Sequence, residues 1–279
     1  MPEGPEIRRS ADELNEALQG QFLERVEIGL PSLQPSHKDI VRQKVLKVTS
    51  WGKAMLIHLE NALSIYSHNQ LYGVWRVSAR DKQPETSRSL RLGLHTAMHS
   101  AVLYSASDIS VWPTQGLHQQ PLLSKLGPDV LSDDLTIAQI KDRLSSPRFC
   151  KSKLSSLFLN QHFIAGIGNY LRSEILFFAG LHPDVTPRQL SCEQLELLAK
   201  ATQSVCLRSY ATGGYTVDET RWREALRRND DFETSRFMVF DREQLSCREC
   251  SYPIERINRN GRRLYLCLSC QPSYSKAHR

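Results

Sequence analysis

Four of the seven cysteines form two close pairs near the end of the chain, in the pattern C-x2-C-x16-C-x2-C. They are Cys247, Cys250, Cys267 and Cys270. Two such pairs around a hairpin-sized insert are typical of one structural Zn²⁺ ion held by four thiolates. Two disulfides are the alternative, which a reducing compartment disfavours. Because four protein ligands leave no open coordination position, we expect this zinc to hold a fold rather than to catalyse.

The insert between the cysteine pairs carries arginines around a predicted turn. Its centre reads NRNGRR, and Asn260-Gly261 is a strong signal for a two-residue hairpin turn. Such a turn would present Arg259, Arg262 and Arg263 outward, where a guanidinium fork can bind a phosphate. The simpler alternative is that these arginines only make the turn soluble. The last 44 residues hold nine basic and four acidic side chains, which favours a polyanionic partner.

The amino terminus reads MPEGPE and places two carboxylates, Glu3 and Glu6, beside a predicted helix over residues 6–18. Prolines at positions 2 and 5 fix φ and remove amide donors, so this terminus is restricted. Apolar residues at positions 7, 11, 14 and 18 mark one helical face, and Gly20 follows where a C-terminal cap belongs.

Three further segments allow a functional and a structural interpretation. Lys53 follows a glycine among apolar neighbours, and most such lysines simply extend along the surface. The triplet Gln70-Leu71-Tyr72 suits either a wedge that fills a gap in a base stack or an ordinary core strand. Asn169 follows a GIG turn at the predicted start of a helix. It could bind a phosphate there, or it could only cap the helix.

The elements that must position these residues change character along the chain. Partial alternation predicts strands of an antiparallel sandwich or barrel within residues 44–59, 62–77, 90–96 and 100–112. Residues 121–131 look like a linker. Helical spacing follows in residues 134–144, 151–161, 169–180 and 192–207, and residues 211–235 look like a loop. The sequence thus predicts a β-rich domain, a helical domain and a small metal module.

Length and composition fit a multidomain globular protein. The chain has 279 residues, of which 40% are hydrophobic and 24% charged, and its formal charge is +6. Without a run of eighteen apolar residues, a transmembrane helix is not expected. The acidic stretch ADELNE after MPEGPEIRR is unlike the apolar core of a signal peptide. We therefore expect a cytoplasmic protein of a bacterium or a similar compartment.

Taken in order, these motifs resemble the Fpg/Nei family of bifunctional DNA glycosylases, and its endonuclease VIII branch in particular. The resemblance runs through MPEGPE, WGKAML, YSHNQLYGVWRV, LYSASDI, GPDVL, SPRF, GIGNYLRSEIL and the cysteine pattern with GRRLYLC. It implies an antiparallel β-sandwich with a leading helix over residues 1–120, a helix-two-turn-helix domain over 121–235 and a zinc-finger hairpin over 236–272. The partner would be damaged double-stranded DNA, bound between the domains of a nucleoid-associated monomer.

The resemblance also implies a reaction on the amino-terminal proline. After loss of Met1, the Pro2 amine would attack C1′ of a damaged nucleoside, expel the base and form an iminium for strand elimination. An α-amino group titrates near pH 7.7–8.0, so a usable neutral fraction exists at about pH 7. Glu3 would act as general acid and base. Lys53 and Arg262 would be the proton donors for β- and δ-elimination.

The DNA contacts implied by the resemblance are Gln70, Lys125 and Asn169, with Leu71 and Tyr72 completing the loop that fills the hole left by a flipped base. Lys125 stands where the endonuclease VIII pattern has an arginine, which keeps the charge but loses the planar fork. Residues 220–235 are longer than the family pattern. The opening motif and the Gln-Leu-Tyr triplet favour oxidised pyrimidines over oxidised purines as substrates.

Two other functions fit part of this pattern. A formamidopyrimidine-type enzyme that excises oxidised purines would share the nucleophile and the finger. A non-catalytic zinc-ribbon DNA-binding protein would share only the finger. A zinc-ribbon protein does not need Pro2 and Glu3. Their presence together with Lys53 and Arg262 argues against a non-catalytic protein.

Overall fold

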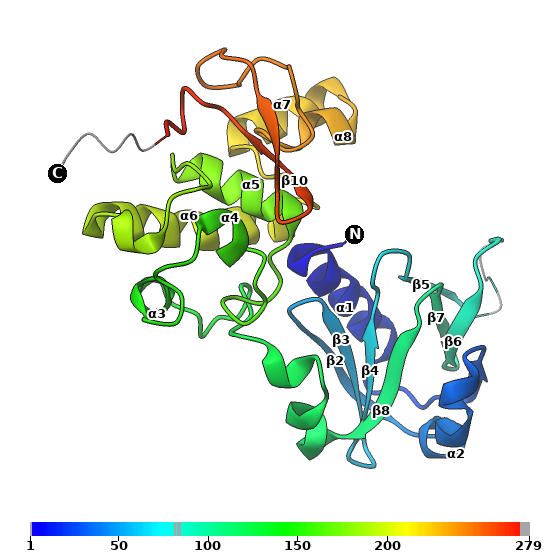
Figure 1. Cartoon of the computed structure of the whole chain (residues 1–279). Helices are drawn as coiled ribbons and strands as arrows, with labels where there is room; N and C mark the ends of the chain where they lie inside the picture. Colours follow the sequence, from blue (N-terminus) through cyan, green and yellow to red (C-terminus); the bar gives the residue numbers. More distant parts are fainter. Residues whose placement is uncertain (1, 81, 83–84, 274–279) are drawn as a thin grey trace. The chain divides into compact units, whose positions relative to one another are not determined.

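The computed structural model describes residues 2–80, 82 and 85–273, which form two compact units divided between Leu126 and Gly127 (Figure 1). The division lies inside the predicted linker, residues 121–131. No helix in the described part of the chain has the length and apolar character needed to cross a membrane.

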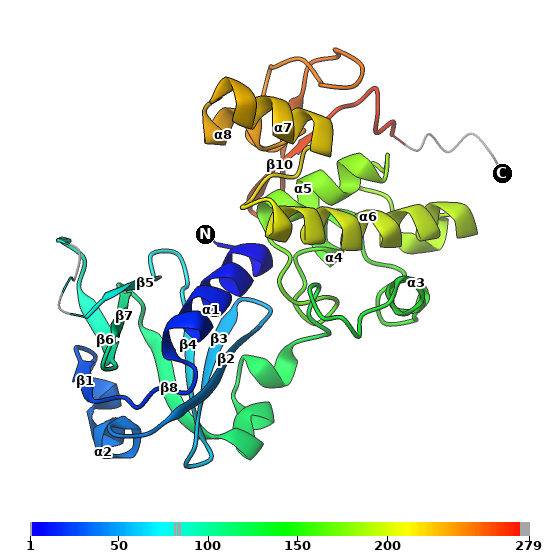
Figure 2. The ribbon, with the colours of Figure 1, turned by 180° about the vertical axis from the view of Figure 1, so that it is seen from behind.

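Helix α1 (Gly4–Leu18) leads the first unit and begins at Glu3. A capping box closes this end, because the Glu6 carboxylate accepts the Glu3 N–H at 2.9 Å and the Glu3 side chain accepts the amide of Glu6. The predicted apolar face, with Ile7 and Leu14, is buried. Helix α1 packs against strands of both sheets, as Figure 2 shows from behind.

The first unit is a two-layer antiparallel sandwich. One sheet has the order β2-β3-β4-β8, made of β2 (Val45–Trp51), β3 (Ala54–Leu59), β4 (Leu63–His68) and β8 (Asp108–Pro113). The other has the order β1-β6-β7-β5, made of β1 (Arg25–Ile28), β6 (Leu90–His95), β7 (His99–Tyr104) and β5 (Val74–Ala79). Both sheets and α1 bury side chains in one core. The predicted sandwich is confirmed, while the four-residue β1 was too short to be predicted.

Short helical segments connect the strands of this unit. A 3₁₀ turn (Pro31–Ser36) and α2 (His37–Ile40) follow β1, and two further 3₁₀ turns (Thr114–Gln119 and Leu123–Lys125) follow β8. The last two cover the outer face of sheet β2-β3-β4-β8, where they pack over Tyr66 and Leu56.

The second unit is helical, with α3 (Ile137–Ser145), α4 (Leu154–Leu157), α5 (Asn169–Phe178), a 3₁₀ turn (Pro187–Gln189) and α6 (Cys192–Ala211). Thr136 and Ser191 cap α3 and α6 through capping boxes. The hairpin of β9 (Glu255–Arg259) and β10 (Arg262–Leu266) packs on α5, and Leu264 and Leu266 share a core with the helices. The predicted metal module therefore folds as part of this unit.

Residues 211–235 are not the predicted loop, because they contain α7 (Glu219–Arg228) and α8 (Phe232–Ser235). Asp218 caps α7 by accepting the amide of Arg221 at 3.0 Å. Only Trp222 and Ala225 of α7 pack on the core around Met238. Only three of the ten residues of α7 are apolar, so its two faces differ mainly in charge and the segment shows little of the apolar stripe that predicts a helix.

Glu174 is a fully buried carboxylate on α5 that fixes the start of the finger. It accepts the backbone amides of Met238, Val239 and Phe240, each at 2.9 Å, and the hydroxyl of Thr216 at 2.5 Å. One side chain thus satisfies four buried donors in two segments far apart in the sequence.

We expect Glu174→Ala to lower the free energy of unfolding of the second unit by about 3–5 kcal/mol, because several buried donors lose their acceptor together. Urea denaturation followed by tryptophan fluorescence measures this change. The matched control is Glu219→Ala, an exposed glutamate on α7, where we expect a loss below about 1 kcal/mol. Equal effects of the two substitutions would contradict the assignment of Glu174.

Candidate active site and metal centre

Backbone pairing brings the amino terminus and Lys53 to the same end of the sandwich. The Gly20 amide donates to the Val45 carbonyl at 2.8 Å, and the Asn15 side chain accepts the Val48 amide at 2.7 Å. Helix α1 therefore runs antiparallel to β2. Its first turn, with Glu3, lies toward the end of β2, where the chain turns into β3.

Lys53 lies in that turn, a two-residue connection between Trp51 of β2 and Ala54 of β3, which pair directly. Gly52 has φ +61°, the left-handed conformation that such a turn requires at its first central residue and that glycine adopts without strain. The glycine thus places a half-buried lysine at the tip of a rigid hairpin. At the start of α1, the candidate acid Glu3 is 3% exposed and Pro2 is half-buried.

Residues 69–73, here called the wedge loop, connect β4 to β5 at this end of the sheet. Gly73 donates to the Asn69 carbonyl at 2.7 Å, and a Cβ on Gly73 would lie 2.5 Å from that oxygen, so only glycine closes this turn. Leu71 and Tyr72 are 53% and 69% exposed. The core-strand interpretation of the Gln-Leu-Tyr triplet is therefore wrong, and its apolar tip stands free.

Lys125 lies on the surface near the end of the first unit, in the 3₁₀ turn Leu123–Lys125. The buried Gln120 side chain holds this turn by accepting the amides of Leu122 and Leu123 at 2.7 and 2.8 Å. The lysine is therefore presented from an ordered turn.

Asn169 is the first residue of α5, and Gly168 is its N-cap, so the N-cap interpretation of Asn169 is wrong. The Asn169 side chain instead accepts a hydrogen bond from Arg172 at 2.7 Å. The fully buried Arg172 also donates to the carbonyls of Ser155 and Arg263 at 2.9 and 3.0 Å. It thus connects the start of α5 to the finger. Sequence reasoning missed this role, although a charged residue inside an apolar helix was the available signal.

The finger hairpin has the predicted Asn-Gly turn, with φ +57° at Asn260 and +69° at Gly261. Arg262 and Arg263 are exposed beside it. Arg259 departs from the prediction, because its guanidinium forks onto Asp184 with contacts of 2.9 and 2.6 Å. This arginine anchors the hairpin to the helical part instead of presenting an unpaired fork.

The Asp184–Arg259 pair gives a prediction about stability and pH. Hydrogen bonding to Arg259 lowers the pKa of Asp184 from 3.8 to about 2. A depressed carboxyl pKa stabilises the fold above pH 4 and loses that contribution only as the pH falls toward 2. Because both side chains are partly exposed, we expect Asp184→Asn to cost about 1 kcal/mol of unfolding free energy.

The expected cost of Asp184→Asn is constant between pH 7 and pH 5, because the carboxyl stays ionised throughout that interval. Denaturation of the variant and the unsubstituted protein at both values measures it. Lys153→Met removes the other partner of Asp184, an exposed lysine at 3.2 Å, and should cost less. A difference that shrinks between pH 7 and pH 5 would contradict the assigned pKa.

The four cysteines of the finger converge as the sequence predicts. Their sulfur atoms all lie within 4.8 Å of one another, with Cys250 at 3.4 Å from Cys267 and 3.5 Å from Cys270. A tetrahedral ion with Zn–S bonds of 2.3 Å would hold sulfur atoms about 3.8 Å apart. All four cysteines are free thiols. The donor set fits one metal ion and not two disulfides.

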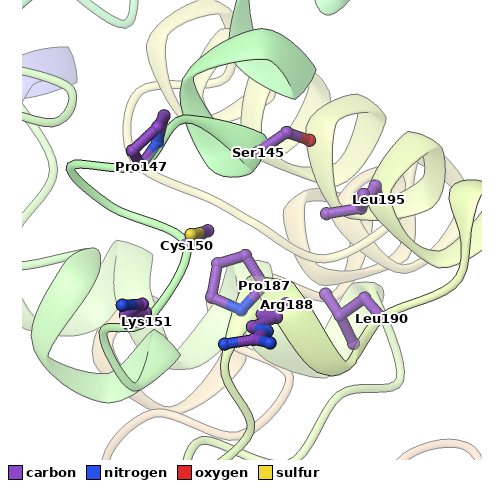
Figure 3. Close-up of a pocket in the computed structure, with 8 residues that line it drawn as sticks. All are labelled: Ser145, Pro147, Cys150, Lys151, Pro187, Arg188, Leu190 and Leu195. Atoms are coloured by element: carbon purple, nitrogen blue, oxygen red, sulfur yellow. The ribbon is translucent and has the colours of Figure 1, made fainter.

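A separate hollow of about 410 Å³ lies in the second unit, between the end of α3, the loop after it, the 3₁₀ turn Pro187–Gln189 and the start of α6. Figure 3 shows Lys151 and Arg188 at its edge beside Cys150 and Pro187. None of the predicted site residues lines this hollow, so we do not place the reaction there.

Known proteins match both units. The profile of the formamidopyrimidine-DNA glycosylase N-terminal domain matches residues 1–107, and that of the formamidopyrimidine-DNA glycosylase H2TH domain matches residues 126–220. A Pectobacterium carotovorum protein named endonuclease 8 is 45% identical over 271 residues, which cover 97% of this chain and all of that protein. Endonuclease 8 of Escherichia coli K12 is 44% identical with the same coverage. The chain belongs to the Fpg/Nei family of DNA glycosylases.

Solved structures of Fpg/Nei proteins share the fold. Lactococcus lactis Fpg, in a complex with DNA containing N7-benzyl-Fapy-dG, matches with a TM-score of 0.81 and 21% identity. The match covers 98% of this chain and 100% of that one. A complex of the same enzyme with DNA containing an abasic site also has a TM-score of 0.81. The predicted family and fold of this Fpg/Nei chain are therefore confirmed.

Proposed function

We propose that this Fpg/Nei DNA glycosylase and abasic-site lyase favours oxidised pyrimidines and reacts through the amine of Pro2. The observation that supports the proposal best is the arrangement at one end of the sandwich. There the buried Glu3 caps the helix that follows Pro2, Lys53 occupies a rigid turn, and the wedge loop exposes Leu71 and Tyr72.

The proposed reaction begins once Met1, which lies outside the described residues, has been removed, because an acylated Pro2 nitrogen is not a nucleophile. Glu3 protonates the sugar ring oxygen as the C1′–O4′ bond breaks and the Pro2 nitrogen bonds to C1′. The C1′–base bond then breaks to leave an iminium, and the departing base takes up the proton that the Pro2 nitrogen releases. The resulting iminium withdraws electrons, so that the C3′–O and then the C5′–O bond can break. We assign Lys53 and Arg262 as the proton donors of these two eliminations.

Side chains from both units support the proposed binding of damaged double-stranded DNA. Gln70-Leu71-Tyr72 would fill the space of the flipped nucleotide, while Lys125, Asn169 and Arg262 would contact the backbone. In this assignment residues 1–120 carry the chemistry, residues 121–235 bind DNA as the helix-two-turn-helix domain, and residues 236–272 form the finger. The enzyme would act as a monomer in the bacterial cytoplasm, on the nucleoid.

The metal of the finger is proposed to be Zn²⁺, held by Cys247, Cys250, Cys267 and Cys270. Bound there, the ion would supply structural cross-linking rather than Lewis-acid catalysis, because all four positions are taken by thiolates. The cysteines fix both ends of the β9–β10 hairpin and so orient Arg262.

A lesion panel tests the proposed substrate preference. Duplexes that differ only in one base, thymine glycol, 5-hydroxyuracil or 8-oxoguanine, are incubated with the enzyme and strand cleavage is followed. We expect the two pyrimidines to give the higher kcat/KM. A clear preference for 8-oxoguanine would favour the formamidopyrimidine-type alternative. Binding without cleavage of any duplex would favour the non-catalytic zinc-ribbon protein.

A further inference from the structure

Two polar residues, His68 and Asp108, are direct neighbours in sheet β2-β3-β4-β8 at the base of the wedge loop. His68, the last residue of β4, pairs with Ala54 of β3 on one side and with Asp108 of β8 on the other. Ala54 directly follows Lys53, so His68 lies between the lysine turn and Asp108. The mechanism above uses neither His68 nor Asp108.

His68 holds one residue of the wedge loop by its backbone. Its Nδ1 atom accepts the amide N–H of Gln70 at 3.1 Å, and the Ser107 hydroxyl donates to the Gln70 side-chain oxygen at 2.8 Å. Gln70 has φ +53°, a left-handed conformation that is strained for a residue other than glycine. One hydrogen bond on the backbone of Gln70 and one on its side chain offset this strain and fix the base of the loop.

The acceptor role of His68 requires its neutral form, with the proton on Nε2, because an imidazolium has two donors and no acceptor. Burial lowers the pKa of His68, as does the charge of Lys53, while Asp108 raises it. Asp108 is also engaged by the buried Tyr66, whose hydroxyl donates to it at 2.9 Å. The surroundings therefore favour the neutral ring that can accept from Gln70.

We propose that His68 is a positioning residue that, as a neutral hydrogen-bond acceptor, fixes Gln70 and the wedge loop in register with Lys53. The inference rests on the function proposed above. A loop ordered before it meets DNA loses less conformational freedom on insertion, so a fixed base lets the exposed Leu71 and Tyr72 act at lower entropic cost.

The test compares His68→Asn with His68→Leu. Asparagine places an acceptor oxygen near the position of Nδ1, while leucine has nearly the same shape and no acceptor. A 2-aminopurine base opposite the lesion reports unstacking by stopped-flow fluorescence, and single-turnover excision is measured on the same duplex. We expect leucine to slow both about three- to tenfold, the effect of one lost hydrogen bond, and asparagine to stay near the unsubstituted rates.

Equal losses in both variants would overturn the proposal, because the acceptor would then not be what matters. Unchanged unstacking in His68→Leu would overturn it as well. If His68→Leu does not fold, judged by its melting temperature, Ser107→Ala removes the hydrogen bond to the Gln70 side chain and must slow unstacking. Since unstacking needs no chemistry, failure of the proposed reaction would show separately, as unstacking without excision in the unsubstituted enzyme.

Discussion

Replacing Glu3 by glutamine is expected to lower the rate of base excision by about two to four orders of magnitude, the usual contribution of a general acid or base. The amide has the shape of the carboxyl and keeps an oxygen that can accept the Glu6 amide, so the cap of α1 survives. What is lost is the proton that the sugar ring oxygen must receive as the base departs. Single-turnover excision with saturating enzyme measures this loss directly.

The control for this substitution is Glu13→Gln, on the same helix but exposed to solvent. It makes the same change of charge without approaching Pro2, and we expect the excision rate to stay within about twofold, as for ordinary surface substitutions. DNA affinity should be unchanged in both variants. If Glu3→Gln excises bases at the unsubstituted rate, Glu3 is not the acid.

Replacing Cys247 by alanine is expected to release the metal and to weaken duplex binding by about a hundredfold. Cys247 is 3% exposed and belongs to the core beneath α7. Its loss therefore removes one ligand of the ion and leaves a gap in the surrounding core. In such fingers the free energy of metal binding provides the free energy of folding, so a finger without its metal unfolds. The disordered hairpin would lose the phosphate contacts of Arg262 and Arg263, and each charged hydrogen bond is worth about 1.5–3 kcal/mol.

Elemental analysis and fluorescence anisotropy with a labelled duplex measure the two effects of Cys247→Ala together. The matched control is Cys192→Ala, an exposed cysteine at the start of α6 outside the cluster. It should keep one zinc per chain and full affinity. Retention of zinc by Cys247→Ala would contradict the four-cysteine site.

Local signals made much of the fold predictable from the sequence. Alternation gave the strands on either side of the wedge loop, and the Asn260-Gly261 pair gave the finger turn with its two positive φ values. The cysteine spacing predicted a cluster that the structure forms. The residues that encode each of these features lie close together in the sequence, about one hairpin apart at most. Their spacing alone is therefore informative.

The parts that were not predictable depend on contacts between distant segments. The guanidinium of Arg259 was predicted to point outward and bind phosphate, because its partner, Asp184, lies 75 positions away in the sequence. His68 was an unremarked strand residue until pairing placed it between Ala54 and Asp108. Helix α7 was missed for a different reason, because only three of its ten residues are apolar and a prediction based on apolar spacing has little to detect there.

Borohydride trapping tests the central claim, that the amine of Pro2 is the nucleophile. Enzyme is mixed with a lesion-containing duplex and reductant, and the cross-linked peptide is mapped by mass spectrometry. A variant that retains Met1 is the control and should form no adduct, because its Pro2 nitrogen is an amide. The account predicts a stable adduct on the amino-terminal Pro2. An adduct on Lys53, or no adduct from an enzyme that still excises the base, would contradict it.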